Sequence, residues 1–324
     1  MALQYTGDSL IKLIRDKGML PDTGSTGTSD ADILEHVNAA FIDDLFPFVV
    51  GLREEYFVVH EKIPVSGDQE KYRIPPRAGW NKLRDVYYQE GTSRWPLDSL
   101  PREDIPNWGT STTGSPHSFY LEGNHIVLFP DLSGASGDLN VAYYFRPGQV
   151  QLQEDVAKIT NVDTSTKTIT CDTMPTSWTT ATKYDVHSQY SGAEIHEWDL
   201  TAASVNTSER TIAFSEAIDG STFGRFPVEV GDYVCIAEET ALPGLPREAH
   251  PVLAQAALCR VLEALGDHEN LQFQKGALDE KKVSLTRGLN ARTESKPIII
   301  NNRNSLMQTN GGSHYGSGTF GARH

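Results

Sequence analysis

Apolar residues recur at helical spacing near the N-terminus, in two sets separated by a polar Gly/Ser/Thr segment. These positions are Leu10, Leu13 and Ile14, followed by Ile33, Val37, Phe41, Leu45 and Phe48. Ser29 with Asp32 three residues later is close to a capping box, which predicts the start of the second helix. Pro47 predicts a kink or break near the end of that helix, because proline lacks the amide N–H and its ring clashes with the preceding turn.

Helical spacing returns after Pro246, in the C-terminal third of the chain. A broad apolar face that includes several alanines runs from Leu253 to Leu265, and small residues permit close helix packing. Leucines then repeat every seven residues from Leu271 to Leu285, which predicts a second long helix ending near Gly288 or Asn290.

Between these helical ends the apolar pattern changes to that of β-strands. Strand-like runs cover 56–65, 72–74 and 83–88, and residues 119–129 predict a hairpin around Glu122-Gly123-Asn124. We expect 139–145 to be the third strand of that hairpin. Residues 92–116 are rich in Pro, Gly, Ser and Thr and predict a loop or short turns.

Residues from about 150 to 232 repeat short strands at regular spacing, which is typical of a small barrel or sandwich. The chain is therefore predicted to be α+β, with a helical core built from its N- and C-terminal segments and an inserted antiparallel β-rich region. The predicted organisation is 1–54 (N-terminal helices), 55–149 (β-rich segment), 150–232 (inserted small β domain), 233–290 (C-terminal helices) and 291–324 (extended C-terminal tail).

The formal net charge of −15 disfavours a general nucleic-acid binder, because such proteins neutralise phosphates with Lys and Arg. No apolar run approaches the ~20 residues of a membrane span, so we expect no membrane partner. No signal peptide is expected either. The cysteines Cys171, Cys235 and Cys259 are odd in number and far apart, which predicts reduced thiols.

A search for chemistry finds no specific motif. The Gly316-x-Gly318-x-x-Gly321 match has no preceding strand and no following helix, so it predicts a flexible tail rather than a dinucleotide site. His187 and His196 could lie on neighbouring strands, but none of the ten histidines has metal-ligand spacing. No cofactor and no metal are therefore expected.

Three tryptophans, Trp80, Trp95 and Trp108, lie in or near the loop-rich segment. One interpretation is packing within the chain, beneath a long loop. The other is a subunit interface, where aromatic residues with a polar atom are favoured.

Three stretches together resemble head-to-tail adaptor (connector, or neck) proteins of tailed bacteriophages. They are the helical pair 8–14 and 31–38, the strand ending Asp138 to Pro147, and Leu245 to Ala257 with the later Pro297-Ile298-Ile299-Ile300. The inserted segment 150–232 departs from the smaller, mostly helical members of that family.

The resemblance implies a non-catalytic virion protein of the neck, assembled in the host cytoplasm. It implies a homo-oligomeric ring, typically of twelve copies, that docks under the portal protein, contacts tail or neck proteins below and lets DNA pass without specific binding. A C-terminal tail that clasps the portal or a neighbour would use Pro297, Ile298, Ile299, Ile300, Tyr315 and Phe320.

Two alternatives remain open on the sequence. The first is another virion component, such as a tail-tube, baseplate or tail-terminator protein, although a long C-terminal helical pair is unusual there. The second is a peptidoglycan-degrading enzyme, which needs two convergent carboxylates. Glu54 paired with Asp85 is the best candidate for those carboxylates, since Glu54-Glu55 alone is too common a pair to be informative.

Overall fold

The computed structural model describes residues 5–21, 28–66, 69–101, 103, 114–130, 137–190, 192, 194–219 and 227–289. Contacts define one compact unit over Met1–Gly288, to which every element named here belongs. The α+β class predicted from the sequence is confirmed. None of the helices among these residues is long and apolar enough to cross a membrane.

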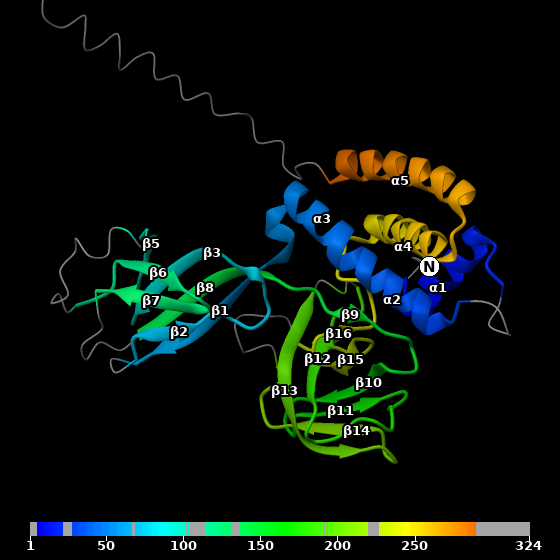
Figure 1. Cartoon of the computed structure of the whole chain (residues 1–324). Coiled ribbons are helices and arrows are strands. Elements are labelled where there is room, and N and C mark those ends of the chain that lie inside the picture. Colours follow the sequence, from blue (N-terminus) through cyan, green and yellow to red (C-terminus); the bar gives the residue numbers. More distant parts are fainter. Residues whose placement is uncertain are drawn as a thin grey trace, which may run out of the picture. The chain divides into compact units, whose positions relative to one another are not determined.

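The helical part joins the two ends of the chain (Figure 1). Its elements are α1 (Gly7–Gly18), α2 (Asp30–Ala40), the π-helical segment η1 (Phe41–Leu45), α3 (Phe46–Leu52), the 3-10 turns η2 (Glu54–Phe57) and η4 (Arg247–Ala249), α4 (His250–Leu265) and α5 (His268–Gly288). Helix α4 contacts α1, α2 and α5, and most of its residues are buried. This arrangement confirms the predicted helical core of N- and C-terminal segments.

Local chemistry explains where these helices begin and end. Ser29 and Asp32 form the predicted capping box, in which each side chain bonds the backbone N–H of the other residue. The predicted break at Pro47 takes the form of a π-helical turn just before it, in which the Phe46 N–H bonds the Phe41 carbonyl. The wider turn relieves the clash that a proline ring makes with the preceding turn of an α-helix.

A β-sandwich of two four-stranded sheets follows the N-terminal helices. Its strands are β1 (Val58–Val65), β2 (Lys71–Arg73), β3 (Ala78–Glu90), β4 (Ser93–Pro96), β5 (Asp98–Ser99), β6 (Ser118–Glu122), β7 (His125–Phe129) and β8 (Gly137–Phe145). The sheet orders are β1-β8-β3-β4 and β2-β7-β6-β5. Buried side chains from both sheets form one shared core.

The hairpin β6–β7 is confirmed, but the prediction that 139–145 is its third strand is wrong. Strand β8 instead lies in the other sheet, antiparallel to both β1 and β3. Its residues are buried nearly without interruption from Val141 to Phe145, as expected for a central strand covered on both sides. Alternation within one strand does not reveal its partners, which is why the sequence misplaced it.

A closed six-stranded barrel with the order β10-β11-β14-β13-β12-β15 follows the sandwich. The strands are β10 (Ala157–Asp163), β11 (Thr168–Cys171), β12 (Lys183–His187), β13 (Ile195–Asn206), β14 (Thr211–Phe214) and β15 (Tyr233–Ile236). The barrel has its own apolar core, which includes Trp178 and Tyr184. A short parallel pair, β9 (Gln149–Val150) and β16 (Glu239–Thr240), lies on the two connections between the barrel and the rest of the chain.

Asn38 on α2 joins the helical part to β9 through two hydrogen bonds. Its amide donates to the Val150 carbonyl at 3.0 Å, and its side-chain oxygen accepts the Val150 N–H at 2.8 Å. Since Val150 is fully buried, water cannot replace either bond.

We predict that Asn38→Ala lowers the free energy of unfolding by about 2–3 kcal/mol, because two buried backbone groups lose their partners. Chemical denaturation of the full chain measures this loss. Asn161→Ala, on an exposed position of β10, serves as the control and should change the free energy by no more than about 0.5 kcal/mol. Equal effects of the two substitutions would contradict the role given to Asn38.

Candidate functional site

A buried ion pair joins the sandwich to the barrel. Arg77, in the turn before β3, directs its guanidinium at Asp185 of β12, with N–O distances of 2.5 and 2.9 Å. The same guanidinium donates to Asp199 of β13 at 2.9 Å. Arg77 is 5% exposed and Asp185 is fully buried, so both charges depend on this geometry for their compensation.

Backbone donors complete the environment of Asp185. Its two carboxylate oxygens also accept the N–H groups of Asp199 and Glu238, each at 3.0 Å. Burial alone would lower the pKa of Arg77, but its bonds to Asp185 and Asp199 outweigh burial and raise that pKa. The guanidinium therefore stays charged at any pH at which the protein folds.

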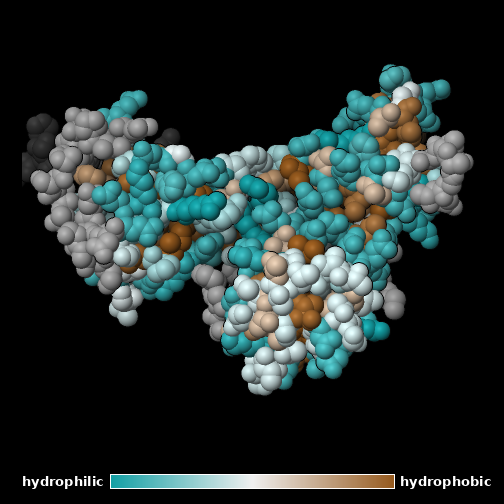
Figure 2. Space-filling model, turned by 60° about the horizontal axis from the view of Figure 1, so that its bottom comes forward, coloured by the Kyte–Doolittle hydropathy of each residue, from teal (hydrophilic) through white to brown (hydrophobic). Residues whose placement is uncertain are grey.

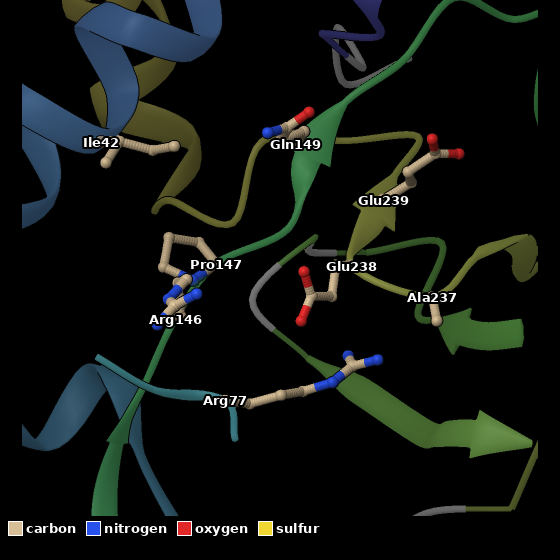
Figure 3. Close-up of a pocket in the computed structure, with 8 residues that line it drawn as sticks. All are labelled: Ile42, Arg77, Arg146, Pro147, Gln149, Ala237, Glu238 and Glu239. Carbon is tan, nitrogen blue, oxygen red and sulfur yellow. The ribbon is translucent and has the colours of Figure 1, made fainter. Parts of the chain in front are cut away.

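A cavity of about 500 Å³ lies beside this ion pair, between the sandwich, the barrel and η1. Its lining residues are Ile42, Arg77, Arg146, Pro147, Gln149, Ala237, Glu238 and Glu239. Figure 3 shows the Glu238 carboxylate pointing into the space between Pro147 and Arg77, whereas the Glu239 carboxylate points away from it. None of the lining residues is a Ser, Cys or His, and its acidic groups are Glu238 and Glu239.

Glu239 is the most perturbed carboxylate near the cavity. Burial raises its pKa to about 7, and the nearby carboxylates of Asp155 and Asp185 act in the same direction. The Glu239 carbonyl oxygen accepts a hydrogen bond from Nε2 of His187 at 2.9 Å. Burial lowers the pKa of His187, which keeps this imidazole neutral.

The structure does place His187 and His196 on neighbouring strands, but they do not converge on a common site. His196 lies 3.3 Å from Asp232, an ion-pair distance. Although burial acts in the opposite direction, hydrogen bonds from His196 and from the N–H groups of Glu229 and Gln189 lower the pKa of Asp232. Among the described residues no group of three or more His, Cys, Asp and Glu side chains could hold a metal ion.

The candidate carboxylates Glu54 and Asp85 come together only around Arg84. Arg84 lies 3.7 Å from Glu54 and 3.5 Å from Asp85, and Glu54 also accepts the Tyr144 hydroxyl at 2.8 Å. Their side chains are 53% and 46% exposed. Both carboxylates therefore belong to an exposed ion-pair cluster rather than to a cleft that could enclose a sugar.

The three tryptophans have different environments. Trp95 packs against the sandwich core, and its indole N–H donates to the Pro116 carbonyl at 2.8 Å. Trp80 is 58% exposed. Trp108 lies outside the described residues, as do Pro297, Ile298, Ile299, Ile300, Tyr315 and Phe320 of the tail. Trp95 thus packs within the chain, and an interface role for Trp80 stays a prediction.

Trp80 lies on a bulge of β3. Ala78 and Leu83 of β3 are five positions apart, whereas their partners on β8, Phe145 and Tyr143, are two positions apart. Strand β3 therefore contains three extra residues here that do not pair with β8. Trp80 (φ 52°) and Asn81 (φ 54°) both adopt left-handed backbone conformations, which cost about 1–2 kcal/mol each for residues other than glycine. Strain of this kind persists only where the surroundings fix it, and it concentrates at functional sites.

Three contacts hold this bulge in place. The Trp80 indole stacks on the Phe46 ring at 4.8 Å with an interplanar angle of 18°. The Asn81 amide donates to Asn124 in the β6–β7 turn at 2.8 Å, and the Lys82 ammonium lies 4.8 Å above the Tyr144 ring. One face of the indole is covered by Phe46, which leaves the rest of a rigid aromatic ring available to a partner.

Sequence reasoning missed Arg77, Asp185 and the Trp80 bulge. Arg77 and Asp185 are 108 residues apart, and no local pattern links them. The turn-forming pair Gly79 and Asn81 around Trp80 was an available signal for the bulge.

These features define an α+β protein with a helical core, a sandwich and a barrel, and with an exposed, rigidly held aromatic residue. Residues 6–190 match the family model described as SU10 adaptor protein, which is more than half of the chain. The chain therefore belongs to the SU10 adaptor protein family, and the predicted resemblance to phage head-to-tail adaptors is confirmed. It is a structural adaptor protein of a bacteriophage and a component of the virion. No curated protein matches the chain.

We predict that Arg77→Met lowers the free energy of unfolding by about 3–5 kcal/mol, because it leaves the Asp185 carboxylate buried and unpaired. Adding Asp185→Asn to this variant should recover part of the loss, and denaturant titration of the single and double variants measures it. Arg84→Met, at an exposed ion pair, is the control and should cost under about 1 kcal/mol. A loss at Arg77 no larger than that at Arg84 would refute the assignment.

Glu239 gives a prediction with a defined pH window. Its pKa is raised from 4.5 to about 7 on folding, so the folded chain holds this proton more tightly than the unfolded chain does. Its ionisation therefore costs stability increasingly as the pH rises from 4.5 to about 7, and fully above that. Glu239→Gln should raise the melting temperature more at about pH 8 than at about pH 5.

Glu238→Gln removes the same charge from the neighbouring, exposed position and is the matched control for this experiment. An equal gain from both glutamine variants at both pH values would show that burial of Glu239 is not the cause.

Proposed function

We propose that this chain is a ring-forming head-to-tail adaptor that docks under the portal, links the capsid to the tail and leaves a channel for DNA. The observation that carries the proposal is the family match over 6–190, which spans the N-terminal helices α1 to α3, the sandwich and the first barrel strands. We further propose that the role is purely structural, with no catalytic activity.

The partners in this proposal are the portal protein, tail or neck proteins below it, and other copies of the same chain, with twelve the expected number. The protein would assemble in the host cytoplasm and act in the neck of the virion. The tail residues Pro297, Ile298, Ile299, Ile300, Tyr315 and Phe320 are proposed to hold the portal or a neighbouring copy. The charge of −15 suits a channel through which DNA passes, because an acidic wall does not retain phosphates.

A ring requires a heterologous interface, in which one surface of each copy meets a different surface of the next. Hydrophobic residues on the face shown in Figure 2 occur as separate small areas among hydrophilic ones. A few buried anchor residues usually carry most of the binding energy of an interface, and tryptophan is enriched among such anchors. Trp80, exposed and held in a strained bulge, is the anchor that we propose.

Electron microscopy of the purified full chain, alone and mixed with the portal protein of the same phage, tests the function. We expect closed rings with a central channel that stack coaxially on the portal. A chain that stays monomeric and does not bind the portal would refute the proposal, and stacked tubes would indicate a tail-tube protein instead.

We predict that Trp80→Ala weakens self-association by about 30-fold, the effect of losing an interface anchor worth about 2 kcal/mol. Analytical ultracentrifugation over a concentration series measures this change. Tyr190→Ala is the matched control, because Tyr190 is 60% exposed and stacks on no described aromatic ring. Equal weakening by both substitutions would argue against a specific role for Trp80, and thermal melting of each variant confirms that it is folded.

A further inference from the structure

Strand β1 is the one long open edge of the sandwich in the part of the chain that the structure describes. The sheet orders make β1, β4, β2 and β5 the four edge strands. Strand β1 has eight residues, whereas β4 has four, β2 three and β5 two. Proteins usually keep exposed edges short because unpaired N–H and C=O groups recruit further strands. Strand β1 is therefore the edge with the longest run of backbone groups to which a further strand could bind, although Pro64 interrupts it near its end.

The apolar face of β1 is also incompletely covered. Val59 and Ile63 point toward the sandwich core and pack against it, but both remain only partly buried. Their partners on β8, Tyr143 and Leu139, are fully buried. A further strand beside β1 would cover Val59 and Ile63 and remove apolar surface from water, which is favourable.

A hollow of about 570 Å³ lies next to the same strand. Three of its lining residues belong to β1 (His60, Glu61 and Lys62), and the others are Tyr87, Arg94 and Asn140. An edge strand with an adjacent pocket is the arrangement by which domains bind extended peptides, since the edge bonds the backbone and the pocket receives alternate side chains.

The chain itself contains a segment that fits. Pro297-Ile298-Ile299-Ile300-Asn301 holds three consecutive β-branched residues, and in a strand Ile298 and Ile300 would share one face while Ile299 would take the other. Eight residues separate it from the end of α5 at Gly288, which gives a reach of about 27 Å when extended. Residues 290–324 carry four basic residues and one acidic residue in a chain of net charge −15, so charge draws this segment toward the body of a copy.

We propose that residues 297–301 of one copy add a strand to the β1 edge of a neighbouring copy. Ile299 lies on the outer face over the hollow, opposite His60 or Lys62. One of Ile298 and Ile300 then covers Val59 (with Ile299 at His60) or Ile63 (with Ile299 at Lys62), and the other lies beside Glu61. Pro64 has no N–H, so pairing is confined to Val58–Ile63. This proposal depends on the proposed ring function in one respect: the assembly must place a neighbouring copy beside β1.

Disulfide trapping tests this pairing, because side chains on adjacent strands lie about 4.5–5.5 Å apart at Cβ. The variants His60→Cys/Ile299→Cys and Lys62→Cys/Ile299→Cys cover two adjacent registers on the outer face of β1. The native cysteines Cys171, Cys235 and Cys259 are all buried, so the parent chain gives a low background. Ser93→Cys/Ile299→Cys, with the acceptor on the short edge β4, is the matched control.

After mild oxidation of the full-length variants, we expect reducible dimers and larger species for a β1 pair and none for the β4 control. A disulfide within one chain, identified by peptide mapping, would overturn the exchange between copies. An absence of disulfides with both β1 pairs, or equal trapping at β4, would overturn the pairing itself.

Electron microscopy of the same samples separates this inference from the proposed function. Rings without trapping at β1 overturn the strand addition and leave the adaptor function in place. A parent chain that never forms rings overturns the proposed function whatever the trapping result.

Discussion

The arrangement of the β regions depends on the compensation of two buried charges. Arg77 and Asp185 have almost no access to water, and each would be strongly destabilising without the other. The bidentate geometry also fixes direction, since a guanidinium meets a carboxylate in this way only when their planes align. Because Asp185 additionally accepts two backbone N–H groups, the turn before β3 is tied to β12, to β13 and to the chain before β16 at once.

Local signals predicted the elements of this fold better than their partners. The capping box at Ser29, the Gly123-Asn124 turn and the end of α5 at Gly288 depend on a few neighbouring residues, so the sequence shows them directly. The place of β8 between β1 and β3 depends on residues 49 to 86 positions away, and strand alternation carries no information about that pairing. The Arg77–Asp185 ion pair could not be predicted either, because its two residues are 108 positions apart in the sequence.

The sequence indicated that tryptophans of this segment could form an interface, but it did not indicate which of them is exposed. Three tryptophans of one segment were candidates for an interface, but composition alone could not separate a packed ring from an exposed one. Trp95 finds a carbonyl partner and the sandwich core, whereas the left-handed backbone at Trp80 turns its indole outward onto Phe46. That difference arises from three inserted residues in one strand, and only the register against β8 reveals it.

The barrel and the sandwich differ in their exposed strand edges, and this difference determines which of them could bind a further strand. The barrel closes on itself, so its described strands leave no open edge to which a partner strand could bind. The sandwich keeps three of its edges short and leaves β1 long, and it also carries the strained Trp80 bulge. An open edge is a liability for an isolated chain but not for a subunit whose edge is covered on assembly. Because Arg77 bonds Asp185 of β12 and Asp199 of β13, a partner strand bound at the β1 edge would meet a sandwich that is already joined to the barrel.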